Sequence, residues 1–415
     1  MKRYDKYKES GISWIGDIPE HWEMKRLKSR LSLVKDRGAN SIKVGLENIE
    51  SFTGRFFPSE SLFDGEGVQV HIGDIVYGKL RPYLCKVWLA SFECSAIGDF
   101  YVFRCGSDCD KRFMSYLFLS APFTGVCNAS TYGAKMPRVS SNFMLSLPIS
   151  LPPLSEQETI VAYLEEKVTQ MDNLVAKREA QIAYLRELKQ AVIAKAVTQG
   201  IDPQAPLCPS GIPWIGNIPE HWEEVKMRKI IDFFSDKGYP DETLLSVVRE
   251  RGVIIRDTES KEENHNYIPS DLSGYKRVQQ GDFVINKMKA WQGSYAVSDY
   301  QGIVSPAYYT CKLRIPNKVF FNLAIRSKVY VPFFTQYSKG IRVDQWDLSP
   351  IGLKDIPFFL PPPSEQEAIV TYINRKTEEI DRLIAMTEQE IARVRELKQT
   401  VIADVVTGRI NVQPS

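Results

Sequence analysis

Residues 151–198 read LPPLSEQETIVAYLEEKVTQMDNLVAKREAQIAYLRELKQAVIAKAVT, and residues 360–407 read LPPPSEQEAIVTYINRKTEEIDRLIAMTEQEIARVRELKQTVIADVVT. The two segments align without a gap at a shift of 209 residues. Self-similarity over this length predicts that the chain of 415 residues contains two copies of one structural unit.

Each segment has the sequence pattern of a long helix. Prolines hold the chain extended just before Ser155 and Ser364, and a glutamate follows three residues later, at Glu158 and Glu367. This serine and glutamate spacing predicts a capping box at the first turn. The helices are expected to stop at glycines, which are Gly200 and Gly408.

Apolar residues recur every three or four positions along both predicted helices, so each helix has one apolar face. A helix of about 45 residues is about 65 Å long, and alone it would leave this face in water. We therefore predict that the two helices pack as an antiparallel pair, with a globular block at each end and a pseudo-twofold axis. The seam between them is expected to contain Ile160, Leu164, Met171, Leu185 and Leu188 from the first helix, and Ile369, Ile373, Ile380, Val394 and Leu397 from the second.

A shorter repeat precedes each half of the chain. Residues 10–23 read SGISWIGDIPEHWE, and residues 210–223 read SGIPWIGNIPEHWE. These lead-in peptides are too apolar for free linkers, and their glycines and prolines predict compact turns. Each is either a strap that docks its block on the long helices or the first core layer of the block. His21 and His221 have no partners at metal-ligand spacing and are expected to be structural.

The blocks between the repeats have mixed strand and helix patterns. FYVFRC at Phe100–Cys105 and AYYTCKL at Ala307–Leu313 predict strands, and residues 108–120 predict a helix. The fold class is therefore α+β, with two mixed α/β globular domains separated by an antiparallel coiled coil. The predicted segments are a lead-in (1–20), a first domain (21–152), a first long helix (153–200), a linker with the second lead-in (201–220), a second domain (221–361), a second long helix (362–409) and a tail (410–415).

Composition excludes several classes of protein. The chain is 43% hydrophobic and 25% charged, with a net charge of +2, which is ordinary for a globular protein. No run of eighteen apolar residues and no signal peptide is present, so we expect a cytoplasmic protein without a membrane partner. Seven cysteines do not form a disulfide framework, and Cys105 and Cys109 are spaced too widely for a CxxC metal knuckle.

Sequence motifs for catalysis are missing. The chain has no glycine-rich phosphate loop, no HExxH or GxSxG motif, and no Asp/Asn-Pro-Pro-aromatic tetrapeptide of amino-methyltransferases. Residues 240–242 read PDE, but no Glu-x-Lys follows at the distance that a nuclease motif requires. We therefore expect a chain that is not an enzyme by itself and that holds no cofactor or metal.

Four loops mix basic, aromatic and amide side chains, in corresponding places of the two blocks. They are residues 79–83 and 131–138 in the first block, and residues 286–293 and 337–346 in the second. Arginine and lysine neutralise phosphates or bind guanine, glutamine reads adenine, and aromatic rings pack on bases. The candidate DNA contacts are Lys79, Arg81, Tyr83, Lys135 and Arg138, followed by Lys287, Lys289, Gln292, Lys339, Arg342 and Gln345.

The order of these features resembles one protein family. A lead-in with WIGDIPEHWE, a variable block, LPPLSEQE and a long helix ending in RELKQAVIAKAVTQG, all written twice, is similar to the specificity subunit of type I restriction-modification systems. The resemblance implies two target recognition domains, each reading one half of a bipartite, asymmetric site in double-stranded DNA. It also implies two modification subunits that use S-adenosylmethionine to methylate adenine, and restriction subunits that cleave DNA with ATP and Mg.

Two other classes of function stay open at this point. A stand-alone DNA methyltransferase or nuclease would bind S-adenosylmethionine or cut DNA as the purified chain. A coiled-coil scaffold with protein-binding blocks would show no sequence-selective DNA binding, even when modification subunits are supplied.

Overall fold

The computed structural model describes residues 2–38, 40–59, 63–257, 268–340 and 346–413. The chain divides into two compact units. Unit 1 comprises Met1–Glu179 with Glu388–Ser415, and unit 2 comprises Ala180–Thr387. Each unit therefore contains one lead-in peptide, one variable block and one half of each long helix, and the two units are described separately.

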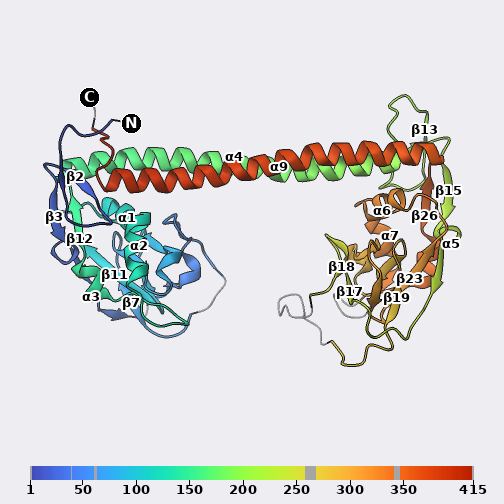
Figure 1. Cartoon of the computed structure of the whole chain (residues 1–415), viewed down its shortest axis with the longest axis horizontal. Coiled ribbons are helices and arrows are strands. Elements are labelled where there is room, and N and C mark those ends of the chain that lie inside the picture. Colours follow the sequence, from blue (N-terminus) through green and yellow to red (C-terminus); the bar gives the residue numbers. More distant parts are fainter. Residues whose placement is uncertain (1, 39, 60–62, 258–267, 341–345, 414–415) are drawn as a thin grey trace. The chain divides into compact units, whose positions relative to one another are not determined.

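The two long helices are α4 (Leu154–Gln199) and α9 (Pro363–Val406), drawn in green and red in Figure 1. Each begins one residue before the predicted serine. The carbonyl groups of Pro153 and Pro362 accept the first-turn amide hydrogen bonds, so the serines lie inside the helix. The capping-box prediction is therefore wrong, because the residue at the N-cap position is a proline, which has no side-chain hydroxyl, and not the serine.

The halves of the two long helices that belong to unit 1 run antiparallel. Lys398 Nζ lies 2.8 Å from a carboxylate oxygen of Asp172, and Arg395 lies 2.7 Å from Glu179. Residue numbers thus rise along α4 while those of their partners fall along α9. The predicted antiparallel pairing is confirmed within this unit.

The predicted seam needs a correction at one level in each unit. The Leu188 and Leu397 side chains are exposed, at 37% and 49%. Lys189 and Lys398 occupy the seam in their place, and Lys189 binds Asp381 at 2.6 Å. The prediction placed the next seam residue three positions after Leu185 and Val394, whereas in the packed helices it lies four positions after them. A lysine can occupy such a position because its aliphatic chain packs on apolar neighbours while its ammonium group binds an aspartate. The other seam residues are buried or half-buried, namely Ile160, Leu164, Met171, Leu185, Ile369, Ile373, Ile380 and Val394.

The globular block of unit 1 is built on two four-stranded sheets. The first has the order β4 (Leu31–Leu33), β11 (Phe100–Cys105), β8 (Ile75–Gly78) and β9 (Val87–Leu89), and all its pairs are antiparallel. The second has the order β5 (Arg37–Gly38), β7 (Gly67–Val70), β10 (Cys94–Ala96) and β6 (Lys43–Val44). The helices of this block are α1 (Lys111–Leu119), α2 (Ala121–Ala129) and α3 (Ser141–Ser146), with short 3-10 turns at Leu27–Ser29, Leu46–Asn48 and Pro82–Leu84. Two-stranded pairs join β1 (Tyr7–Glu9) to β2 (Asp17–Pro19) and β3 (Glu23–Arg26) to β12 (Pro148–Leu151).

Unit 2 repeats the first of these sheets. Its strands have the order β16 (Ile231–Phe234), β23 (Tyr308–Leu313), β20 (Phe283–Asn286) and β21 (Tyr295–Val297). Its helices are α5 (Met227–Ile230), α6 (Lys318–Arg326), α7 (Val331–Gln336) and α8 (Pro350–Asp355), with a 3-10 turn at Ala290–Gln292. Two-stranded pairs join β13 (Leu207–Pro209) to β14 (Asn217–Pro219), β15 (Glu223–Lys226) to β26 (Pro357–Leu360), β17 (Leu245–Val248) to β18 (Gly252–Ile255), β19 (Lys276–Val278) to β22 (Gly302–Val304), and β24 (Ser338–Lys339) to β25 (Asp347–Leu348).

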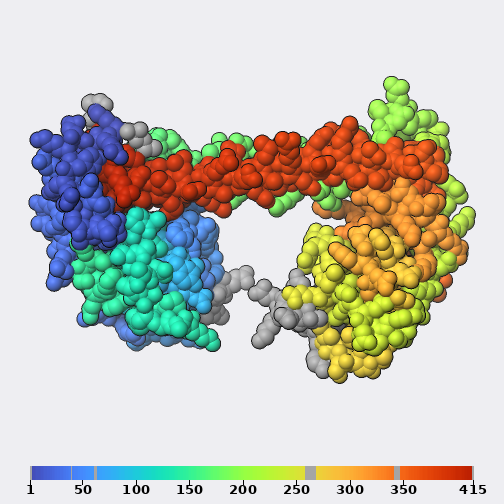
Figure 2. Space-filling model, in the orientation of Figure 1, coloured from blue at the N-terminus to red at the C-terminus, as the bar shows by residue number. Residues whose placement is uncertain are grey.

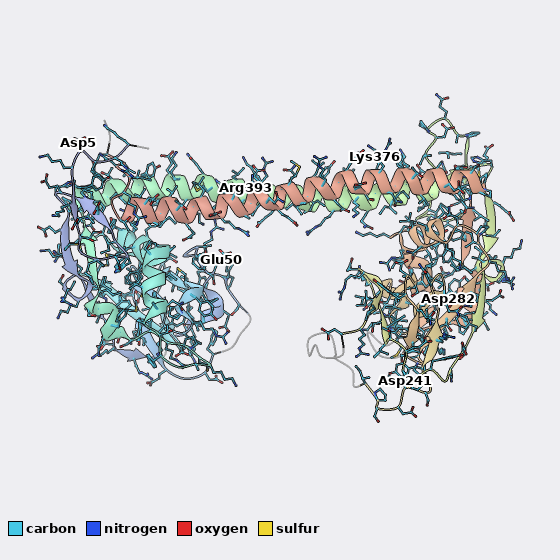
Figure 3. The ribbon with its side chains drawn as sticks, viewed as in Figure 1. Asp5, Glu50, Asp241, Asp282, Lys376 and Arg393 are labelled. Carbon is cyan, nitrogen blue, oxygen red and sulfur yellow. The ribbon has the colours of Figure 1, made fainter. Side chains whose placement is uncertain are left out.

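Several local predictions are confirmed in these blocks. The strand predicted at Phe100–Cys105 is β11, the strand predicted at Ala307–Leu313 is β23, and the helix predicted within 108–120 is α1. The Asp110 side chain caps α1 by accepting two backbone amides. The repeated sheet also repeats an ion pair, because Asp74 binds Arg104 at 2.7 Å in unit 1 and Asp282, labelled in Figure 3, binds Lys312 at 2.9 Å in unit 2.

The lead-in peptide of unit 1 binds the first turn of α4. Glu156 accepts hydrogen bonds from Trp22 Nε1 at 3.1 Å and from the Tyr4 hydroxyl at 2.6 Å, and its second oxygen lies 2.8 Å from His21 Nε2. Burial and the bond to Glu156 raise the pKa of Tyr4, so its hydroxyl stays a donor. A carboxylate at a helix N-terminus is also favoured by the helix dipole.

Unit 2 repeats this joint on the first turn of α9. Glu365 lies 2.7 Å from His221 Nε2 and accepts a 3.1 Å hydrogen bond from Trp222 Nε1. The two histidines thus have the structural role that was predicted, each as a partner of a helix glutamate.

Each lead-in peptide also contacts the end of the other long helix. Gly408, after α9, has a φ of +78°, and a Cβ there would lie 2.4 Å from Pro19 Cδ. Gly200, after α4, has a φ of +72°, and a Cβ there would lie 3.5 Å from Trp222 Cζ2 and 3.8 Å from Pro219 Cγ. Because Trp22 is also buried in the core of its block, both readings of the lead-in peptide hold. It is a strap between two helix ends and a core layer at once.

Candidate nucleic-acid interface

The first pair of candidate loops lies side by side in unit 1. Residues 79–85 follow β8, and residues 131–139 follow α2. The Arg81 amide donates to the Pro137 carbonyl at 2.7 Å, and the Val139 amide donates to the Lys79 carbonyl at 3.1 Å. We call these two segments the first loop pair.

The charged side chains of the first loop pair fall into two groups. Arg138 donates to both carboxylate oxygens of Asp99, at 3.0 and 2.9 Å, and Lys79 lies 3.7 Å from the same group. The hydrogen bond from Arg138 holds the pKa of Asp99 below its usual value. Arg81 and Lys135 are exposed instead. The first group therefore joins the loops, and the second is available to a ligand.

The first loop pair also carries exposed aromatic side chains. The predicted contact Tyr83 is exposed, and so is Tyr132, which was not predicted. The Arg81 backbone has a φ of +49°, which a non-glycine residue rarely adopts. The hydrogen bond from the Arg81 amide to the Pro137 carbonyl of the second loop stabilises this conformation. A surface of two cations and two aromatic rings suits phosphates and bases.

Unit 2 contains an equivalent second loop pair, formed by residues 287–293 and the described part of 337–348. The Leu348 amide donates to the Lys287 carbonyl at 3.0 Å, and Lys287 Nζ lies 2.9 Å from Asp347. The rings of Trp291 and Trp346 lie 5.1 Å apart. The candidates Lys289 and Lys339 are exposed, whereas the candidates Arg342 and Gln345 lie outside the described residues.

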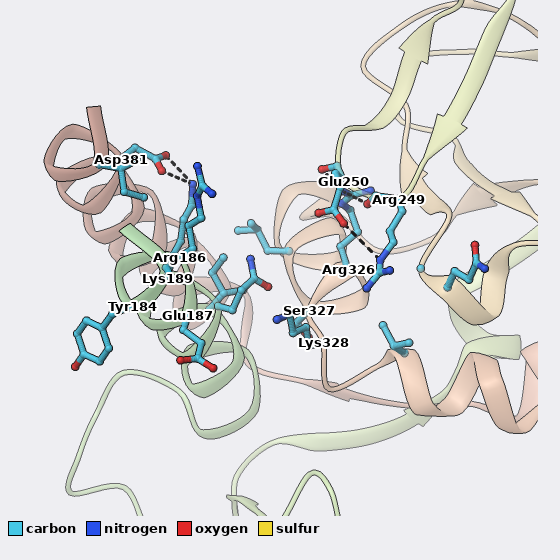
Figure 4. Close-up of a pocket in the computed structure, with 18 of the residues that line it drawn as sticks. Tyr184, Arg186, Glu187, Lys189, Arg249, Glu250, Arg326, Ser327, Lys328 and Asp381 are labelled. Atoms are coloured by element: carbon cyan, nitrogen blue, oxygen red, sulfur yellow. Dashed lines mark hydrogen bonds and ion pairs between the residues drawn. The ribbon is translucent and has the colours of Figure 1, made fainter. Parts of the chain in front are cut away.

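The candidate Gln292 lines a cavity of about 1150 Å³ in unit 2, between its block and α4 (Figure 4). Arg326, on the wall of this cavity, donates to the backbone carbonyls of Tyr295, Arg249 and Glu250. Burial lowers the pKa of Arg326. These bonds give Arg326 a structural role, and Lys189 on the opposite wall binds Asp381.

Besides Tyr132, sequence reasoning missed Asp99 and Tyr101. Asp99 was missed because its pairing with Arg138 is a long-range contact that no local pattern reports. Tyr101 was missed although its match with Tyr309 could have been found by aligning the two predicted strands.

Other kinds of site have no support in the described part of the chain. No cluster of three or more histidine, cysteine, aspartate or glutamate side chains there could hold a metal ion. All seven cysteines are free thiols. In the same residues no helix is long and apolar enough to span a membrane.

Comparisons with known proteins agree with the predicted resemblance. A family model described as the type I restriction modification DNA specificity domain matches residues 63–184. The specificity subunit of the type I restriction enzyme EcoDI from Escherichia coli is 28% identical over 193 residues, which cover 44% of this chain and 43% of that subunit. The putative MjaX specificity subunit from Methanocaldococcus jannaschii is 24% identical over 98% of both chains.

Two solved structures share the fold. One is a chain from a study of complex assembly and conformational transition in a type I restriction-modification system, with a TM-score of 0.66, 18% identity and coverage of 94% of this chain and 98% of that one. The other is the HsdS subunit from Thermoanaerobacter tengcongensis, with a TM-score of 0.51, 19% identity and coverage of 95% and 98%. Two mixed α/β domains with a pair of long helices are thus the fold of this chain and of these structures. In sequence and in fold the chain is thus similar to the specificity subunits of type I restriction-modification systems.

Proposed function

We propose that this chain is the DNA sequence-recognition subunit of a type I restriction-modification complex, in which each block reads one half of a bipartite, asymmetric site. One observation supports this function most strongly. The same two-loop arrangement occurs in both blocks, but it presents different side chains. Two surfaces with one backbone plan and different chemistry suit two half-sites of different sequence.

The exposed side chains of the loop pairs are the proposed readers. Arg81 has the donor geometry to bind a guanine edge, and Lys135, Lys289 and Lys339 suit phosphates. A base-reading arginine changed to alanine should cost about 1–3 kcal/mol at one position of the site, whereas a phosphate-binding lysine should weaken all sequences alike. Lys79, Arg138 and Lys287 act indirectly, because their charges are bound to aspartates within the loops.

The long helices offer places for two identical partners. Leu174 and Leu397 are exposed in unit 1, and their repeat equivalents Leu383 and Leu188 are exposed in unit 2. On the face shown in Figure 2, α9, coloured red, is open to view along much of its length. Exposed apolar side chains at repeated positions support one modification subunit on each unit.

Catalysis is assigned to the partner subunits. In this proposal the modification subunits bind S-adenosylmethionine and methylate adenine, and the restriction subunits use ATP and Mg to cleave DNA. The long helices set the number of unread base pairs between the half-sites, which should be close to one helical turn of DNA, about 34 Å.

Mapping methylated adenines tests this proposal. The chain is expressed with the modification subunits of its own system in cells that lack other methyltransferases, and the genome is sequenced for methylated adenine. The proposal predicts one bipartite site with two unlike halves and a fixed spacer. Absence of a sequence-specific methylated site would favour the scaffold function, and S-adenosylmethionine binding by the purified chain would favour the stand-alone enzyme.

A further inference from the structure

The junction between the two loops of the first loop pair depends on one buried residue. Val139 is fully buried at the end of the second loop. Its amide donates to the Lys79 carbonyl at 3.1 Å, and its carbonyl accepts a 3.2 Å hydrogen bond from the Tyr101 hydroxyl. Tyr101 lies on β11, which pairs with β8, the strand that leads into the first loop. The tyrosine thus connects the second loop to the sheet that carries the first loop.

The second loop pair contains the same junction. Leu348 is 1% exposed, its amide donates to the Lys287 carbonyl at 3.0 Å, and its carbonyl accepts a 3.0 Å hydrogen bond from the Tyr309 hydroxyl. Tyr309 lies on β23, which pairs with β20 in the same way. Burial raises the pKa of Tyr309, so its hydroxyl remains a donor.

The residues next to these junctions are not repeated. Arg138 precedes Val139 and binds Asp99, whereas Asp347 precedes Leu348 and binds Lys287. The charge at this position is therefore opposite in the two units. The tyrosine, the buried acceptor residue, the lysine and the main-chain hydrogen bond between the loops are retained, while the residue before the acceptor changes from Arg138 to Asp347.

We propose that Tyr101 and Tyr309 are positioning residues that fix the separation of the two DNA-reading loops, each for its own half-site. This inference rests on the proposed function. Loss of the hydroxyl leaves a buried carbonyl without its partner, and a shift of the second loop is the cheapest way to rehydrate that carbonyl. Base contacts depend on a precise loop position, whereas phosphate contacts tolerate a shift. Sequence discrimination should therefore suffer more than affinity for DNA.

The substitutions Tyr101→Phe and Tyr309→Phe test this inference because they remove only the hydroxyl. The full chain is assembled with its modification subunits, and methylation is measured on a library of sites in which each half-site is varied in turn. Tyr101→Phe should reduce discrimination in one half-site by about three- to tenfold, and Tyr309→Phe should do the same in the other. Tyr300→Phe is the matched control, because Tyr300 is exposed and lies outside both loop pairs.

The outcomes separate positioning from a general effect on stability. Thermal unfolding of both variants should stay within a few degrees of the parent protein, and the distant half-site should keep its discrimination. Unchanged discrimination in both half-sites, or an equal loss in both, would overturn the inference. A parent complex that reads no bipartite site would instead overturn the proposed function on which it rests.

Discussion

The lead-in joints and the loop pairs repeat in opposite ways. The joints keep their side chains, since a histidine and a tryptophan bind the first-turn glutamate in both units. The loop pairs keep one main-chain hydrogen bond from a buried residue to a lysine carbonyl, and a tyrosine that binds the same buried residue, but most of their exposed residues differ. The repeated joints hold the helix ends, which have the same task in both units. The loops diverge because each is expected to read its own half-site.

The largest expected effect comes from shortening the part that both units share. Deletion of four residues within Val168–Val175, together with four within Thr377–Ile384, removes about one helical turn from each long helix, or about 6 Å. The spacer should shorten by about two base pairs at 3.4 Å each, while both half-sites keep their sequence. Methylated-site sequencing checks this, and an unchanged spacer would contradict the role of the helices.

The two joints are expected to differ in how much their glutamates contribute to stability. The Glu156 side chain is 6% exposed and binds Tyr4, His21 and Trp22, whereas the Glu365 side chain is 21% exposed and binds His221 and Trp222. Removing a buried acceptor that binds several donors costs about 2–3 kcal/mol, and less where water reaches the site. Glu156→Ala should therefore lower the free energy of unfolding more than Glu365→Ala does. Urea unfolding measures both, and an equal loss would show that Tyr4 contributes nothing.

A smaller difference is expected between the two seam lysines. Lys398 binds Asp172, whose side chain is 18% exposed, and Lys189 binds Asp381, whose side chain is 56% exposed. Loss of one partner is more costly where the remaining charge is less hydrated. Lys398→Ala should cost about 2 kcal/mol and Lys189→Ala about 1 kcal/mol. If Lys189→Ala is the more costly change, burial does not determine the strength of these pairs.

Much of the fold could be predicted from the sequence because its signals are local and repeated. Apolar periodicity that occurs in both halves of the chain predicted the long helices and their antiparallel pairing, and local sequence patterns predicted the strands β11 and β23. The seam prediction was wrong at Leu188 and Leu397, because spacings of three and of four residues between seam positions both fit the apolar pattern. Only the register of the neighbouring helix decides between a leucine and the adjacent lysine.

The candidate site was predicted less completely than the fold. The sequence identified loops that the structure brings together, one after a strand and one after a helix in each unit. It could not separate Arg138, which binds Asp99, from Arg81, which is exposed. That distinction depends on a partner 39 residues away in the chain, which the loop sequence does not specify.

The most direct test of the account changes the exposed cations of one loop pair at a time. One variant carries Arg81→Ala with Lys135→Ala, and the other carries Lys289→Ala with Lys339→Ala, each assembled with the modification subunits. Methylated-adenine mapping should show that the first variant loosens the sequence requirement of one half-site and leaves the other unchanged, whereas the second lowers methylation of all sites alike, because its lysines are assigned to phosphates. A first variant that loosens both half-sites, or neither, would contradict the assignment of one half-site to each block.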